Sequence, residues 1–147
     1  MNCKERNYEL ILEIIAYPDN AVSFTSPMQI PCKYLEDGDV TLSEDLGFNI
    51  PMTRQTGKLQ ETEKVELGGK SYTVSLTWNI DNPDKSTYEK LEKLQKTFKH
   101  LKVKTFGGDL LFIRSIDDGY RFTYEEDSGT IKCSLSVINI NGVQRIM

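Results

Sequence analysis

The sequence is poor in the residues that most often bind metals or perform catalysis. It contains one histidine, His100, and three cysteines, Cys3, Cys32 and Cys133. No two cysteines form a C-x-x-C unit, so a Cys/His zinc site would need a carboxylate or water as a further ligand. The odd number of cysteines and their long spacings indicate reduced thiols. We therefore expect no metal and no other cofactor.

Long apolar runs and a strong charge are also missing. No run of about 18 apolar residues is present, so no membrane span is predicted. Glu9 and Glu13 interrupt the apolar stretch near the N-terminus, and no small-residue cleavage site follows, so no targeting segment is expected. The net charge of −4 argues against nucleic acid as a partner. We expect a cytoplasmic location where the protein is made.

What the sequence does contain is the composition of an ordinary globular domain. With 147 residues, of which 38% are hydrophobic, the chain can bury a core without disulfides or metals. We expect a single domain over residues 1–147 in the α+β class, mainly β. It should have one or more antiparallel sheets, with about six to eight strands and one amphipathic helix packed on a sheet.

Strands are predicted in the first third of the chain. Residues 8–17 are rich in Ile and Tyr and stop at Pro18, which favours a strand over a helix. Pro31 makes residues 28–35 an edge strand or a bulge. Residues 40–42 form a short strand after an acidic turn.

Residues 47–63 are predicted to form a long, mobile loop, because proline, glycine and polar residues dominate them. The alternative is that the segment holds a strand without a clear pattern. Loops of this length are often functional, and a polar one can become ordered on assembly. The residues of a candidate assembly loop are Arg54, Gln55, Thr56 and Lys58.

The clearest strand pattern surrounds Gly68-Gly69, which predicts a hairpin between residues 64–67 and 70–80. Residues of the second arm alternate between apolar and hydroxyl side chains. The face predicted to be buried comprises Tyr72, Val74, Leu76 and Trp78.

One helix is predicted over residues 86–102. Ser86 and Glu89 have the spacing of a capping box. Apolar residues recur every three or four positions and predict one buried stripe, formed by Tyr88, Leu91, Leu94, Phe98 and Leu101.

The last forty residues indicate a meander of strands at 109–116, 120–125 and 130–140. Turns are predicted at 117–119 and 127–129, and Asn141-Gly142 precedes a short tail.

We find no catalytic constellation. His100 is predicted to be a surface residue near the helix C-terminus, and the sequence places no nucleophile or carboxylate beside it. Acidic groups coincide with predicted turns, which favours solvation over metal binding. They are Glu36/Asp37/Asp39, Asp117/Asp118 and Glu125/Glu126/Asp127. We expect no enzyme activity. A carboxylate-only site is the alternative, and a metal-dependent thermal shift would detect it.

A run of lysines near the end of the predicted helix is the one surface feature that suggests a contact. It comprises Lys93, Lys96, Lys99, Lys102 and Lys104. These side chains could meet an acidic partner, or they could simply solubilise the helix and complement its dipole.

The order of elements from Tyr72 to Ile140 resembles that of small tail and baseplate proteins of bacteriophages and related contractile injection systems, including the tail protein U group. An alternating strand, YTVSLTW, leads into a helix, then the extended segment KVKTF and a glycine pair. The strand DLLFIRSI, the turn DDG and two further strands follow. In that family the strand after the helix carries a segment similar to Ile113-Arg114-Ser115-Ile116. The resemblance implies a structural protein that multimerises or bridges tail components.

Two hypotheses follow. The first is a non-enzymatic component of a phage or phage-like tail or baseplate, with copies of itself and other tail proteins as partners and incorporation in a virion or tail-like particle. The alternative is a small soluble inhibitor or immunity-type protein that binds one partner protein. Self-association separates the two hypotheses.

Overall fold

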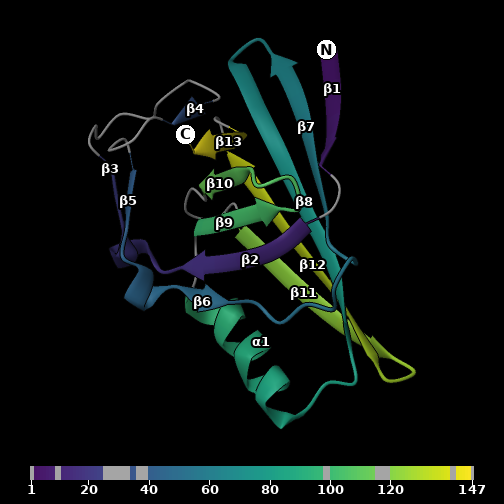
Figure 1. Ribbon diagram of the computed structural model, residues 1–147. Helices are drawn as coiled ribbons and strands as arrows, with labels where there is room; N and C mark the ends of the chain where they lie inside the picture. The colour runs from purple at the N-terminus through teal and green to yellow at the C-terminus, as the bar shows by residue number, and fades with distance from the viewer. Residues whose placement is uncertain are drawn as a thin grey trace.

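Two mainly antiparallel sheets pack face to face, and one helix lies below them (Figure 1). The computed structural model describes residues 2–8, 11–24, 34–35, 40–97, 100–114, 120–139 and 142–146. These residues form thirteen strands, one α-helix and two short 3₁₀ turns, η1 (Asp19–Ala21) and η2 (Glu44–Leu46). The predicted class, α+β and mainly β, is confirmed, and the described residues contain more strands than the six to eight expected.

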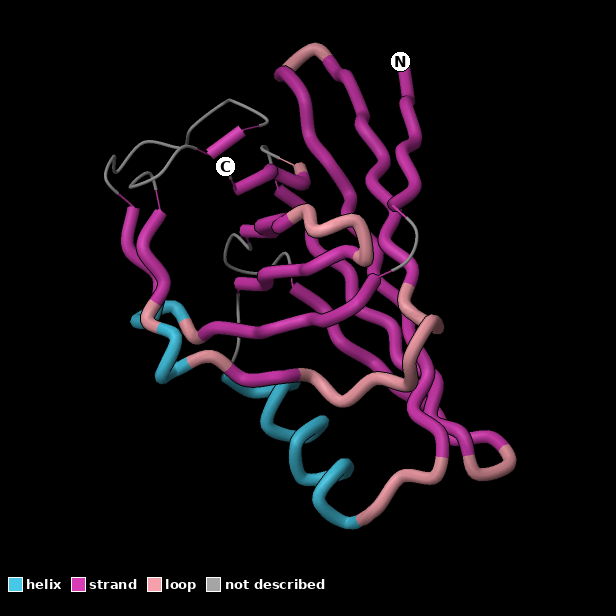
Figure 2. Tube along the Cα trace, in the orientation of Figure 1, coloured by secondary structure: helices cyan, strands magenta, loops and turns pink. Residues whose placement is uncertain are grey.

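The larger strands form a five-stranded sheet. Its order is β1 (Asn2–Tyr8), β7 (Lys58–Glu66), β8 (Gly69–Asp81), β12 (Thr130–Asn139) and β11 (Tyr120–Asp127). The hairpin of β7 and β8 pairs Glu66 with Gly69, and β12 pairs with β8 over ten residues. The predicted hairpin is thus present, with its turn one residue earlier than Gly68-Gly69 (Figure 2).

The second sheet has six shorter strands. Its order is β4 (Tyr34–Leu35), β13 (Val143–Ile146), β10 (Leu110–Arg114), β9 (His100–Thr105), β2 (Ile11–Tyr17) and β6 (Phe48–Asn49). All its pairs are antiparallel except β13 with β4. A separate ribbon of β3 (Val22–Phe24) and β5 (Val40–Leu42) lies beside this sheet (Figure 1).

The core lies between the two sheets because each long strand alternates apolar and polar residues. Val74, Leu76 and Trp78 of β8 are buried, as predicted, and the side chains between them point to the other face. Trp78 also stacks on Phe122 of β11 at 5.8 Å between ring centroids. Burial of each large apolar side chain contributes about 1.5–3 kcal/mol. One continuous cluster includes residues from both sheets and the helix.

The helix, α1 (Lys85–Thr97), is shorter than the predicted 86–102. Leu91 and Leu94 are fully buried, as the stripe predicted, and Phe98 lies outside the described residues. The predicted end of the helix is wrong because residues 100–105 form β9. Leu101 suits either period, but the alternation of Leu101, Val103 and Thr105 into the core belongs to a strand.

The predicted capping box is not the N-cap. Asp84 precedes the helix, and its carboxylate accepts hydrogen bonds from the Thr87 backbone N–H (2.9 Å) and hydroxyl (3.0 Å). These hydrogen bonds lower the pKa of Asp84.

The predicted meander is interrupted. Strand β10 pairs with β9 and β13 in the six-stranded sheet, whereas β11 and β12 belong to the other sheet. The chain therefore changes sheet between Arg114 and Tyr120, and the predicted turn at 117–119 lies outside the described residues. The turn at 127–129 is confirmed, because Asp127 pairs with Thr130.

Most of the predicted mobile loop at 47–63 either forms strands or is hydrogen-bonded to β8. Residues 48–49 form β6, and β7 begins at Lys58. The intervening residues lie against β8, where the Thr53 N–H donates to the Asn79 carbonyl (2.8 Å) and the Asn79 N–H donates to the Thr56 hydroxyl (3.1 Å). Threonine side chains thus extend the pairing where the sequence pattern is weak.

Predictions for the N-terminal segments are partly right. The predicted strand at 8–17 is divided between β1, which ends at Tyr8, and β2, which begins at Ile11. Strand β5 confirms residues 40–42. Of residues 28–35, the structure describes Tyr34 and Leu35 in β4, and Pro31 lies outside the described residues.

Candidate functional site

The five predicted contact lysines do not form one helical face. Lys93 and Lys96 lie on α1, whereas Lys102 and Lys104 lie on β9 and Lys99 lies outside the described residues. On the helix, the Lys93 ammonium lies 5.6 Å from the centre of the Phe48 ring, and Lys96 pairs with Glu92 at 3.3 Å. Lys93, Lys96 and Lys104 are exposed and Lys102 is half-buried, so the four described lysines present their charges from two different elements.

Lys102 belongs to a polar cluster on the outer face of the six-stranded sheet. Its ammonium pairs with Glu44 of η2 at 3.1 Å, and the Tyr17 hydroxyl donates to the same carboxylate at 2.8 Å. Burial, and then the hydrogen bond to Glu44, raises the pKa of Tyr17. Partial burial acts to raise the pKa of Glu44, but the hydrogen bonds from Tyr17 and Lys102 lower it overall. These charges fasten η2 to the sheet.

His100 lies in the same face and is not a surface residue. Its side chain is 3% exposed, and Nε2 lies 2.9 Å from the Asp19 carboxylate of η1. The ring stacks on Phe112 at 6.1 Å and meets the edge of Phe24 at 6.2 Å. The Arg114 guanidinium lies 4.0 Å from the centre of the Phe24 ring. Segments η1 and β3 thus cover this end of the sheet.

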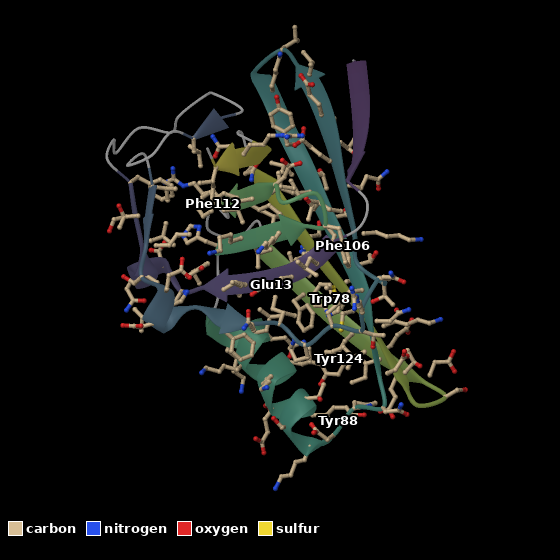
Figure 3. The ribbon with its side chains drawn as sticks, viewed as in Figure 1. Glu13, Trp78, Tyr88, Phe106, Phe112 and Tyr124 are labelled. Atoms are coloured by element: carbon tan, nitrogen blue, oxygen red, sulfur yellow. The ribbon has the colours of Figure 1, made fainter. Side chains whose placement is uncertain are left out.

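The part of that face that η1, η2 and β3 leave uncovered is small. A hollow of about 320 Å³ is lined by Glu13, Ile15, Lys102, Lys104 and Leu110. Glu13 marks this uncovered part in Figure 3, and Phe112 lies toward the covered end.

The outer face of the five-stranded sheet is different, because no described helix or strand packs on it. Its outward side chains are exposed or half-buried, and serine and threonine are the largest group among them. We name it the hydroxyl face: the outer side of β7, β8, β12 and β11, with Thr62, Ser71, Thr73, Ser75, Thr77, Thr123, Thr130, Ser134 and Ser136.

A hollow of about 530 Å³ lies on the hydroxyl face. The strand register explains its position, since Thr77 pairs with Lys58 and Ser134, and Ser134 pairs with Thr123. The outward side chains that line it are Thr56, Lys58, Thr77, Asn79, Thr123, Glu125, Lys132 and Ser134.

Charge is distributed unevenly along the hydroxyl face. Cations lie from the middle toward the β7–β8 turn, and carboxylates lie toward the β11–β12 turn, where Lys132 is 4.0 Å from Asp127. Neither Arg121 nor Glu125 forms an ion pair with a described residue, and both are exposed. The cationic part comprises Lys58, Lys64 and Arg121, and the acidic part comprises Asp81, Glu125 and Asp127, with Lys132 as the one outward cation described among these carboxylates.

The predicted assembly loop contributes to this face in part. Thr56 and Lys58 line the hollow. Arg54 instead lies over the Phe106 ring, 5.5 Å from its centre. Gln55, which lies between Arg54 and Thr56, has a positive φ of 68°. The four residues therefore do not form one contact surface.

The described residues offer little for metal or thiol chemistry. No group of three or more His, Cys, Asp or Glu residues among them could hold a metal ion. The described Cys133 is buried, and burial raises the pKa of its thiol to about 12, so it is a poor nucleophile. Of the predicted acidic turns, the first two lie outside the described residues.

Sequence reasoning missed Arg121 and Ile138 on the hydroxyl face, and it assigned Glu125, Glu126 and Asp127 to a turn although they lie in β11. A usable signal existed, because the predicted turn at 127–129 fixes the β11–β12 register and β12 alternates. Ile138 breaks that alternation as an outward apolar residue that is 55% exposed. It also missed Glu61, a buried carboxylate that accepts a 2.7 Å hydrogen bond from the Val143 N–H.

Within the part of the chain that the structure describes, no helix is long and apolar enough to cross a bilayer. Comparison with protein-family models, with curated proteins and with solved structures found no match.

Proposed function

We propose that this chain is a non-enzymatic structural protein that assembles through protein–protein contacts, as a component of a phage or phage-like tail or baseplate. The observation that carries the proposal is the difference between the two edges of the five-stranded sheet. Among described residues, β1 pairs with β7 alone, so seven residues of strand present unpaired backbone groups on their other side. Such an edge can accept a strand from a neighbour.

The opposite edge is shielded. Helix α1 runs beside β11, where the Tyr88 hydroxyl donates to the Glu126 carboxylate at 2.5 Å and the Gln95 amide reaches the Phe122 carbonyl at 3.5 Å. Figure 3 shows Tyr88 and Tyr124 in this region. Proteins commonly cover edge strands to avoid unwanted pairing. Covering one edge and leaving the other open limits strand pairing with a neighbour to the β1 edge.

Beside the open edge, the β7–β8 hairpin extends beyond the six-stranded sheet (Figure 1). Its turn residue Leu67 is fully exposed. An apolar side chain at a projecting tip gains stability when a neighbour covers it. The order of strand, helix and strands from Tyr72 onward supports the tail-protein part of the proposal by its resemblance to that family.

Light scattering from micromolar to millimolar concentration, with negative-stain microscopy at the upper end, tests the proposal. We expect a rising mass and rings or stacked particles. Leu67→Glu should weaken association, whereas Ser86→Glu, an exposed change of the same charge on α1, should not. A monomer at every concentration would contradict the proposal and favour an inhibitor or immunity-type protein.

A further inference from the structure

We propose that the hydroxyl face is the contact surface for a second copy of this chain, stacked face to face about a two-fold axis. The inference rests on the proposed function for self-association itself, and it specifies where the copies meet. It differs from contact through the β1 edge, which extends a sheet sideways rather than stacking one sheet on another.

Availability is the first argument. A two-layer sandwich has two outer faces, and the chain covers one of them with η1, η2 and the β3–β5 ribbon. On the hydroxyl face the only large apolar side chain described, Ile138, is 55% exposed, although its neighbour Val137 is fully buried. Isolated exposed apolar residues are common, so Ile138 gains significance from the two features that accompany it on the same face.

Charge is the second argument. Arg121 and Glu125 point outward from β11, and their register partners are Ser136 and Lys132 on β12. Consider a two-fold axis that runs across the strands, along the row Thr77–Ser134–Thr123. It places Arg121 of one copy at the position along β11 that Glu125 occupies in the other copy. Arg121 of each copy then faces Glu125 of the other, and two equivalent ion pairs form, as an isologous interface requires.

Arg121 and Glu125 are the charges that this axis sets opposite one another, whereas Asp81 comes to the level of Thr73. The axis moves Ile138 of one copy to the level of Thr130 of the other, beside Lys132 at the end of the hollow. Lys58 lies on the two-fold row at the β7 side, so Lys58 of one copy faces Lys58 of the other, and this like-charge contact weakens the dimer. The two Arg121–Glu125 pairs are therefore what select this stacking register.

Area is the third argument. Four strands about 4.8 Å apart and ten residues long give a face of roughly 600 Å² per copy. The total buried by two copies falls at the lower end of specific interfaces, which begin at about 1,200 Å². Small hydroxyl side chains allow close approach but contribute little apolar burial. We therefore expect a weak, concentration-dependent dimer.

Charge reversal tests the pairing. Sedimentation velocity should show that Arg121→Glu and Glu125→Arg each weaken dimerisation by about tenfold or more, because each places like charges opposite one another. The double variant Arg121→Glu/Glu125→Arg should recover most of the affinity. Circular dichroism checks the fold, and both side chains are exposed in the monomer.

Each outcome bears on a different claim. Self-association that persists unchanged in all three variants would overturn the hydroxyl face as the contact while leaving the proposed function standing. Loss of association in the double variant as well as the singles would overturn the Arg121–Glu125 pairing. A wild-type protein that never self-associates would overturn this inference and the proposed function together.

Discussion

The outer faces of the two sheets have opposite characters. On the six-stranded sheet, aromatic and ionisable side chains such as Phe112, His100 and Tyr17 point outward and are buried by η1, η2 and β3. On the five-stranded sheet, hydroxyl side chains point outward and no described element covers them. The composition of each outer face thus matches whether another segment of the chain covers it. The uncovered face is the one available to a partner.

The largest expected effect comes from the covered face. Phe112→Ala should lower the free energy of unfolding by about 3–4 kcal/mol, because it removes a fully buried ring packed on Phe24 and His100. Thr73→Ala, an outward change on β8, should stay within about 0.5 kcal/mol of wild type. Urea unfolding at low protein concentration measures both. Equal losses would remove the distinction between the two faces.

His100→Ala should cost about 2 kcal/mol, because the buried ring packs between Phe24 and Phe112 and its Nε2 lies 2.9 Å from Asp19. Lys104→Ala, four residues along the same strand and exposed, is the matched control and should have almost no effect. Thermal unfolding of the pair compares a covered with an open position. A neutral His100→Ala would mean that η1 is not held to the sheet through this residue.

A smaller effect is expected at Glu44, whose pKa is lowered by hydrogen bonds from Tyr17 and Lys102. A lowered carboxyl pKa contributes stability above the ordinary value of about 4.3 and loses it as the pH falls through the folded-state pKa. Glu44→Gln should therefore cost about 0.5–1 kcal/mol at neutral pH, since the pair is partly exposed. The difference from wild type should vanish in acid.

Glu125→Gln is the control for that measurement, because it makes the same change on the uncovered face. In dilute, monomeric protein it should change the free energy of unfolding by no more than about 0.5 kcal/mol. A loss at Glu125 equal to that at Glu44 would show that carboxylates on both faces are bound within the monomer.

Strands β8, β11 and β12 were the most predictable part of the fold, whereas β1 and most of β7 were not predicted as strands. Strands β8 and β12 alternate between core and hydroxyl side chains, so their inner faces follow from the sequence. The outward side of β9 and β10 carries His100 and Phe112, which another segment buries, so the alternation that reveals a half-exposed strand is lost. For that reason the sequence pattern extends the predicted helix over the first residues of β9.

The candidate site was less predictable than the fold. The lysine run is close in sequence but is divided between α1 and β9, whose side chains point in different directions. Arg121 and Glu125 become a candidate pair only when the β11–β12 register and the uncovered face are both known. Which outer face is covered depends on contacts between segments that lie far apart in the sequence.

Mixing two variants tests the central claim, that the hydroxyl face binds a second copy, most directly. Arg121→Glu carries two carboxylates at the contact and Glu125→Arg carries two guanidinium groups, so each alone should dimerise about tenfold or more weakly than wild type. The equimolar mixture should form a one-to-one dimer in sedimentation velocity, because both ion pairs are restored. A mixture of Lys90→Glu and Glu89→Arg, with similar charge changes on exposed α1 positions, should show only the association of wild type. If the first mixture remains monomeric while wild type dimerises, the hydroxyl face is not the interface.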